Sequence, residues 1–297
     1  MKPAAPLMPF VAITTAIAVY SAMDTTMKLA SLAVGAFSAT LWRSMAGFAL
    51  VLPLWLREGP RLPGGVLLRL HVIRGVVTAG VATSFFYGLV HLRLAEAIAI
   101  SFIAPLIALF LAAVVLGETI GRAAIGASLL GLGGVAVIAL GSAQEAQTHP
   151  GAVLGIAAVL LSAALYAWNL ILQRQQALLA QPAEVALFQN GVSALTLALA
   201  APWLLVVPQG EAWLSIGASA VLQVAALMLA SWAYGRAEAQ ALVPFEYTAF
   251  LWAVLFGWLA FHEAVEWPTI AGATLIVAGC WLAAPKKRAE HIEQTAL

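Results

Sequence analysis

Long apolar runs separated by short polar stretches set the pattern of this chain. Charged residues, prolines and glycines divide it into ten such runs, near residues 7–29, 36–56, 72–92, 95–116, 122–142, 151–173, 184–206, 213–235, 240–261 and 268–284. Each run has about the 20 residues that an α-helix needs to cross the hydrocarbon core of a bilayer. The runs are continuous and rich in Ala and Leu, whereas the strands of a membrane β-barrel alternate apolar and polar residues. The pattern predicts an all-α integral membrane protein with ten transmembrane helices.

The composition agrees with this prediction. Of the 297 residues, 63% are hydrophobic and 9% are charged, whereas about a quarter of an ordinary soluble domain is charged. So few charges cannot cover the surface of a water-soluble fold of this length. The formal net charge of +1 gives no general attraction to nucleic acid, and the single cysteine, Cys280, excludes disulfides within the chain. We therefore expect the protein to act within the membrane.

Lysine and arginine are distributed unevenly between the two ends of the predicted spans. With a cytoplasmic N-terminus, Arg93 alone falls outside, against eleven residues inside: Lys2, Arg57, Arg61, Arg69, Arg74, Arg122, Arg174, Arg236, Lys286, Lys287 and Arg288. Because loops that face the cytoplasm are enriched in Lys and Arg, both termini are predicted to be cytoplasmic. The first apolar run is interpreted as a retained span. The longest loop is expected from residue 57 to residue 71.

The chain also contains an internal repeat. Gly117-Glu118 ends one span and leads to Gly126-Ala-Ser-Leu-Leu, and His262-Glu263 leads likewise to Gly272-Ala-Thr-Leu-Ile. Each unit holds five spans, so residues 1–146 and 147–297 are predicted to be two copies. Because five is odd, the second copy enters the bilayer with opposite polarity, as in the inverted repeats of many secondary transporters.

Short motifs of the first copy give the chain a family resemblance. They are Ala95-x-Ala97, Ala104-Pro105-Leu106, Leu116-Gly117-Glu118 and Gly126-Ala-x-Leu-Leu. With them the chain resembles the drug/metabolite transporter superfamily in its EamA-type ten-helix branch, and within it bacterial inner-membrane exporters of aromatic amino acids. The resemblance implies a central cavity between the halves, walled by spans one, three, four, six, eight and nine. We expect no cofactor and no metal, and a monomer or weak homodimer.

The sequence lacks the signatures of several enzyme classes. No Gly precedes a Lys, so the phosphate-binding P-loop is absent. Asp24 is the only aspartate, which excludes paired-aspartate proteolysis, and neither a Gly-x-Ser-x-Gly elbow nor a His-Glu-x-x-His helix is present. The five histidines are scattered over predicted loops and span ends. An enzyme is not predicted.

Polar residues inside spans are costly in hydrocarbon and tend to face a cavity or the bundle interior. In span one, Tyr20, Asp24 and Lys28 follow one another at intervals of four and share one helix face. Two interpretations stay open: a substrate-facing stripe, or an Asp24–Lys28 ion pair that only neutralises two charges. Arg43 is a second possible partner for Asp24.

Three further groups of span residues are candidates for the substrate pathway. In span three they are Thr83 and Tyr87, with His91 at the interface. In span six they are Ser162, Tyr166, Trp168, Asn169 and Gln173, whose polar groups could instead bond across helices. Around the prolines of spans four and nine, which loosen the helix, they are Ser101, Phe102, Glu246, Tyr247 and Trp252.

The glycine-rich span ends are expected to serve structure. Glu118 and Glu263 are predicted to cap helices and hold tight turns. Gly126, Gly131, Gly133 and Gly134 are predicted to allow close helix approach in span five. Spans five and ten are interpreted as a scaffold that could also serve a dimer interface.

Together with these residues, the family resemblance implies an alternating-access exporter of amino acids, most of all Phe, Tyr and Trp. The ring would stack on Tyr20, Phe102, Trp168 or Tyr247. The polar end would be held by Ser101, Asn169, Ser231 and the Glu246 carboxylate. An exporter of flat cationic drugs or herbicides is the alternative on the same scaffold, since aromatic walls also attract cations. A non-transporting membrane scaffold, which would have no polar cavity, is a third hypothesis.

Overall fold

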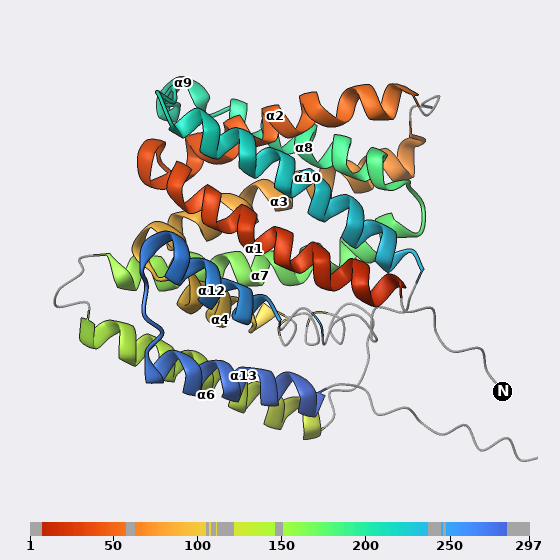
Figure 1. The fold of residues 1–297 in the computed structure, drawn as a ribbon. Helices are drawn as coiled ribbons and strands as arrows, with labels where there is room; N and C mark the ends of the chain where they lie inside the picture. Colours follow the sequence, from red (N-terminus) through yellow and green to blue (C-terminus); the bar gives the residue numbers. More distant parts are fainter. Residues whose placement is uncertain are drawn as a thin grey trace, which may run out of the picture.

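A computed structural model describes residues 8–57, 63–104, 107, 111, 122–145, 151–236, 245 and 248–283. Throughout these residues the regular structure is helical, without strands. The helices are α1 (Met8–Val34), α2 (Ala36–Arg57), α3 (Gly65–His91), α4 (Leu94–Ser101), α6 (Arg122–Glu145), α7 (Ala152–Ala177), α8 (Pro182–Ala198), α9 (Ala201–Leu204), α10 (Ala212–Tyr234), α12 (Ala249–Phe261) and α13 (Trp267–Ala283) (Figure 1). Each predicted span overlaps at least one of these helices. The all-α fold class is confirmed.

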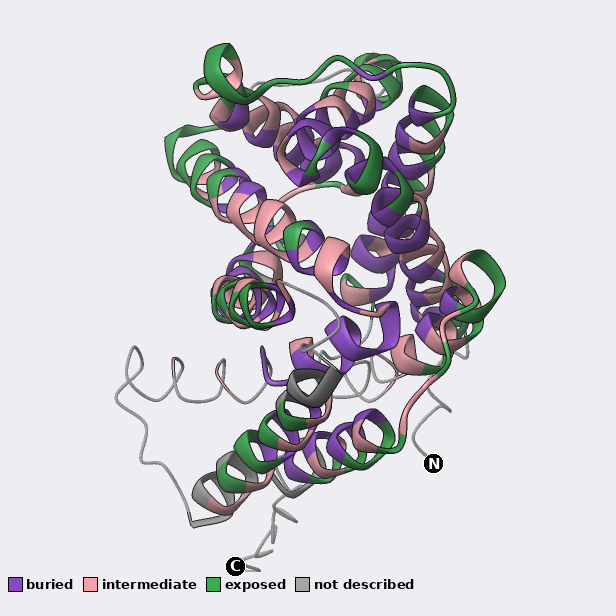
Figure 2. Ribbon diagram, turned by 90° about the vertical axis from the view of Figure 1, so that its left-hand side faces the viewer, coloured by how far each residue is buried: buried purple, intermediate pink, exposed green. Residues whose placement is uncertain are grey.

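The described helices have the apolar character of a membrane protein. Five of them, α1, α2, α3, α7 and α10, are long and apolar enough to cross a bilayer. Buried residues gather where the helices meet, and exposed residues follow the outer faces (Figure 2). Leu195, Leu199 and Trp203 are among the large apolar side chains on these outer faces. Lipid rather than water is the solvent that suits such a surface.

Helix α3 corrects the predicted loop after span two. Its helical residues begin at Gly65, seven residues before the predicted start at 72, so Arg69, His71 and Arg74 are helical. His71 and Arg74 are also buried. Charged and polar residues suggested a loop, but here they find partners on neighbouring helices and can therefore lie inside the bundle.

The helices pair in a pattern that is two-fold symmetric. The closest packed pairs are α1 with α10, α3 with α7, α2 with α8, and α6 with α13. In the order of the repeat these are spans one and eight, three and six, two and seven, and five and ten. Exchanging each span with its counterpart in the other half leaves this set of pairs unchanged. Such exchange is what an inverted duplication requires. The boundary between residues 146 and 147 stays a prediction.

Helices α6 and α13 form a pair at one side of the bundle (Figure 1). Their backbones meet at two glycines: a Cβ added to Gly134 would lie 2.5 Å from the carbonyl oxygen of Gly272, and the converse contact is also 2.5 Å. Only glycine allows this approach, as in other small-residue helix contacts. Gly134 thus has the predicted packing role, whereas a Cβ at Gly133 would meet nothing within 4 Å. A dimer interface on this pair stays a prediction.

Candidate functional site

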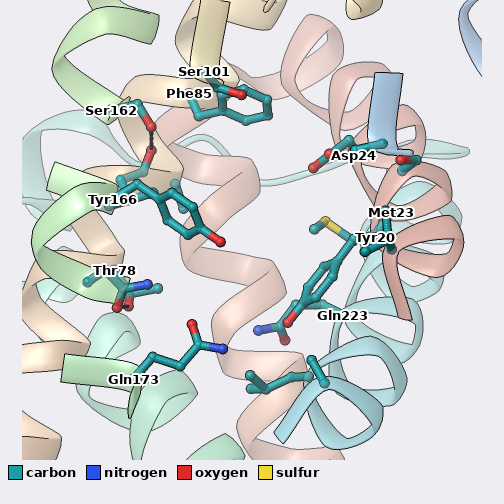
Figure 3. A pocket seen from close by; sticks show the side chains of 18 of the residues that line it. Tyr20, Met23, Asp24, Thr78, Phe85, Ser101, Ser162, Tyr166, Gln173 and Gln223 are labelled. Atoms are coloured by element: carbon teal, nitrogen blue, oxygen red, sulfur yellow. Dashed lines mark hydrogen bonds between the residues drawn. The ribbon is translucent and has the colours of Figure 1, made fainter. Parts of the chain in front are cut away.

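A cavity of about 280 Å³ lies between the two halves of the bundle. Its described wall comes from α1, α2, α3, α4, α7, α8, α10 and the start of α12. In Figure 3, Tyr20, Met23 and Asp24 of α1 face Ser162, Tyr166 and Gln173 of α7 across the cavity, with Gln223 of α10 below. The volume is close to the lower end of ligand pockets, about 300 Å³, and suits one small molecule.

Most of this wall is apolar or aromatic. Phe85, Phe86 and Phe102 supply phenyl rings, and Tyr20, Tyr166 and Tyr234 supply phenol rings. Such rings pack against a flat ligand by offset stacking or edge contacts. The wall can therefore hold an aromatic or aliphatic group without polar partners.

Three charged residues interrupt the apolar wall: Asp24, Arg43 and Arg74. All three are buried, at 9%, 5% and 2% exposure respectively. A buried charge is costly unless another group compensates for it. The three side chains differ sharply in how far the described residues compensate for them.

Arg74 is held by a chain of hydrogen bonds. Its Nε donates to Asn169 Oδ1 at 3.1 Å, and its Nη1 donates to Gln176 Oε1. The amide of Gln176 then donates to His71 Nδ1 at 2.6 Å, so the ring proton of His71 lies on Nε2 and is donated to Glu184 at 3.0 Å. The His71 ring also stacks on Phe188, with centroids 4.5 Å apart. Arg74 is therefore fixed by residues of α3, α7 and α8.

Arg43 is compensated much less. Its guanidinium carbon lies 5.5 Å from the centre of the Phe86 ring, and its Nε is buried without a hydrogen-bond partner among the described residues. Asp24 and Arg43 attract each other electrostatically. No hydrogen bond or ion pair joins the two side chains, however, in the part of the chain that the structure describes. Unused donors of Arg43 and unused acceptors of Asp24 thus remain at the cavity wall.

Two glutamines add further unused polar atoms. Gln189 of α8 and Gln223 of α10 line the cavity, and the Oε1 atom of each is buried without a hydrogen-bond partner among the described residues. Ser101 and Ser162, in contrast, donate to the carbonyl oxygens of Ile98 and Val81. The bond from Ser162 joins α7 to α3, which is the cross-helix alternative for that residue.

The structure brings eight of the predicted pathway residues together at the cavity: Tyr20, Asp24, Ser101, Phe102, Ser162, Tyr166, Asn169 and Gln173. Their part in substrate binding stays a prediction. Glu246 and Tyr247 lie outside the described residues, as do Pro105 and Glu118.

Five predicted site residues lie away from the described cavity lining: Thr83, Tyr87, Trp168, Ser231 and Trp252. Tyr87 and Trp168 are 42% and 39% exposed on the outer surface of the bundle. Each of Thr83, Tyr87 and Trp168 is two residues beyond a lining residue, which rotates it by about 200° to the far side of its helix. Trp252 instead stacks on Phe256, with ring centroids 6.3 Å apart.

Of the two interpretations of span one, the Asp24–Lys28 ion pair is wrong. Lys28 forms its salt bridge with Glu263 and donates to the carbonyl oxygen of Leu92 at 2.7 Å. Glu263 also accepts the backbone N–H of Leu94, at the first turn of α4, at 2.8 Å. It therefore has the predicted capping role, although the helix that it caps belongs to the other half of the chain.

A second ion pair lies beside the first. Arg93 Nη1 is 2.7 Å from Glu266 Oε1. Together Lys28, Arg93, Glu263 and Glu266 tie the ends of α1 and α3 and the start of α4 to the turn between α12 and α13. We call these four residues the clasp. It lies at the bundle end opposite His71 and Glu184, since it is at the C-terminal end of α3 and they are near its N-terminal end.

Among the lining residues that the sequence analysis did not predict are Arg74, Gln189, Gln223 and Tyr234. Arg74 had been counted among the cytoplasmic charges. Gln189 and Gln223 carried a usable signal, because each is a polar residue inside a predicted span. The network around His71 carried none, since its partners are more than 100 residues away in the chain.

Comparisons with known proteins agree with this architecture. The pseudopaline exporter CntI of Pseudomonas aeruginosa is 27% identical over 266 residues, which cover 88% of this chain and 90% of that exporter. A riboflavin transporter of Brucella anthropi is 26% identical over 271 residues, 87% of this chain and 92% of that transporter. A solved crystal structure of a protein with 23% identity covers 93% of this chain and 96% of its own, with a TM-score of 0.60, and shows the fold alone.

The two halves of the chain also match one family separately. The sequence model of the EamA-like transporter family matches residues 7–140 and, a second time, residues 153–284. These two matches cover most of the chain and correspond to the two five-span units. The protein is thus a multi-pass membrane protein, and it belongs to the EamA-like transporter family.

Proposed function

We propose that this protein is a bacterial inner-membrane exporter of small zwitterionic metabolites, above all the aromatic amino acids Phe, Tyr and Trp. It works by alternating access through the cavity between its halves, with both termini in the cytoplasm. The observation that carries the proposal is a cavity of about 280 Å³ in which aromatic rings surround buried charges of both signs. An aromatic amino acid brings a flat apolar ring and a head with one positive and one negative group, and so matches both parts of the wall.

The relatives support a small organic substrate. The Pseudomonas protein is named for export of pseudopaline and the Brucella protein for riboflavin. Neither name refers to an aromatic amino acid. The assignment to amino acids therefore rests on the chemistry of the cavity wall.

The wall disfavours the alternative of a flat cationic drug or herbicide. Its described lining has two guanidinium groups, Arg43 and Arg74, against one carboxylate, Asp24. A compound with only positive charge would be repelled by that balance in a low-dielectric cavity. A neutral zwitterion or an acid is attracted. A cavity lined with buried charges also argues against a non-transporting scaffold, for which such costly groups have no use.

The clasp suits the proposed transport cycle. With cytoplasmic termini, Lys28 and Glu263 lie at the outer end of the bundle and tie the two halves together there. Separation of the clasp would then give access from outside. Exchange of conformations between two inverted halves is the usual basis of such a cycle.

The proposal is tested by flux in liposomes. The purified protein is reconstituted, and movement of labelled phenylalanine, tyrosine and tryptophan is followed against empty vesicles. A labelled flat cation, methyl viologen, is the comparison compound. We expect flux of the amino acids well above that of empty vesicles and none of the cation. Flux of the cation alone would contradict the proposal in favour of drug export.

A further inference from the structure

We infer that Arg43 and Asp24 form a two-charge head-group site that recognises a free carboxylate and a free ammonium group attached to the same carbon atom, as in an unmodified α-amino acid. The inference rests on the proposed function and deepens it. It names the groups that the substrate must carry and the two residues that recognise them.

The two arginines of the cavity differ in how many of their N–H donors are bonded to other residues. The Nε and Nη1 donors of Arg74 are engaged by Asn169 and Gln176. Arg43 instead has a buried Nε without a partner among the described residues. Arginine offers five N–H donors in a planar fork that fits a carboxylate with two parallel bonds. Arg43 is therefore the guanidinium that is available for an anionic group.

Asp24 lines the cavity from α1, and Arg43 lines the same cavity from α2. The two opposite charges attract each other. No direct hydrogen bond or ion pair joins these two described side chains, so their polar groups are not used by each other. The ammonium and carboxylate of an α-amino acid are attached to one carbon atom. Its ammonium can contact Asp24 while its carboxylate contacts Arg43, so both buried charges gain the partner that burial demands.

Gln189 and Gln223 add polar side chains to the same cavity wall. An amide group can donate a hydrogen bond to a carboxylate or accept one from an ammonium group. Tyr20 lies on the same face of α1 as Asp24, lines the same cavity and offers its ring to the substrate side chain.

These contacts predict a strict requirement for both charges. Phenethylamine lacks the carboxylate and leaves Arg43 unpaired, whereas 3-phenylpropionate lacks the ammonium and leaves Asp24 unpaired. A hydrogen bond to a charged group contributes about 1.5–3 kcal/mol, which is about 10- to 150-fold in affinity. We therefore expect each analogue to compete with labelled phenylalanine at least about tenfold more weakly than unlabelled phenylalanine does.

The test measures competition in liposomes that contain the full chain. The wild-type protein is compared with Arg43→Gln and Asp24→Asn, and exposed Arg236→Gln is the matched control. With Arg43→Gln, phenylalanine loses its advantage over phenethylamine but keeps its advantage over 3-phenylpropionate. With Asp24→Asn the pattern is reversed. The control keeps both preferences. A purely structural role would lower flux without exchanging these preferences.

The outcomes are distinguishable from failure of the proposed function. If wild-type vesicles carry no aromatic amino acid, the proposed export of these compounds is wrong. If they carry phenylalanine but both analogues compete as strongly as unlabelled phenylalanine does, the proposed export stands and the two-charge site is wrong. This comparison needs only the wild-type protein, so a variant that fails to fold leaves the inference open to refutation.

Discussion

Replacement of Glu263 by Gln removes one of the two negative charges of the clasp while keeping the size of the side chain. Glu263 pairs with Lys28 and accepts the backbone N–H of Leu94, and Lys28 is only 5% exposed. The variant therefore leaves a buried ammonium with neutral partners in place of the carboxylate, among them the carbonyl oxygen of Leu92 and the Phe261 ring. We expect the outer end of the bundle to open more often.

The size of this shift follows from the bonds that are lost. A hydrogen bond to a charged group contributes about 1.5–3 kcal/mol. If the clasp forms only when the outer end is closed, its loss moves the equilibrium toward the outward-open state by about 10- to 150-fold. The population of the outward-open state rises by nearly this whole factor when that state is rare in the wild type.

Thiol accessibility measures this equilibrium. Cys280→Ala removes the natural thiol, and Ser162→Cys places a reporter in the cavity wall. A membrane-impermeant maleimide is added from the outside of intact cells. We expect faster labelling in Glu263→Gln than in the parent, and no change in the matched control Glu211→Gln, an exposed acid. An unchanged labelling rate in a well-folded Glu263→Gln protein would refute the assignment of the clasp as an outer gate.

Three other substitutions give expected outcomes. His71→Ala leaves the Gln176 amide without its acceptor, so thermal unfolding of the purified protein should show a loss of about 1–3 kcal/mol; an unchanged unfolding temperature would contradict the role of this hydrogen-bond network. Gly134→Leu should lower the unfolding temperature because of its 2.5 Å contact across the pair, while Gly133→Leu, with free space, should not; equal effects would contradict the packing. Tyr166→Ala should reduce flux, and Trp168→Ala on the outer surface should leave it unchanged; the reverse order in the transport assay would contradict the position of the cavity.

The helical architecture could be predicted because hydrocarbon imposes it. Unbroken apolar runs of membrane-spanning length have few stable alternatives in a bilayer, and the similar motifs at Gly126 and Gly272 revealed the duplication. Span three was placed seven residues late because Arg69 and His71 suggested a loop. Hydropathy averages over a window and cannot recognise a polar side chain whose partner lies on another helix.

The cavity was predictable only in part for the same reason. Polar positions such as Asn169 were found, because a polar group inside a span seeks the bundle interior. Trp168 was misplaced because an aromatic residue is stable both against lipid and in a cavity, so its type does not determine its direction. The clasp was invisible in the sequence, since Lys28 and Glu263 are separated by 235 positions.

Protection of a cavity residue by substrate tests whether phenylalanine binds in the cavity between the two halves. In purified Cys280→Ala protein that carries Ser162→Cys, the maleimide reaction rate is measured with and without phenylalanine. Because Ser162 lines the cavity, we expect phenylalanine to slow the reaction at this position. We expect no slowing at an exposed Gln209→Cys control. If phenylalanine is transported by this protein but leaves the maleimide reaction rate at residue 162 unchanged, the substrate binds elsewhere. That result would contradict binding in the cavity between the two halves.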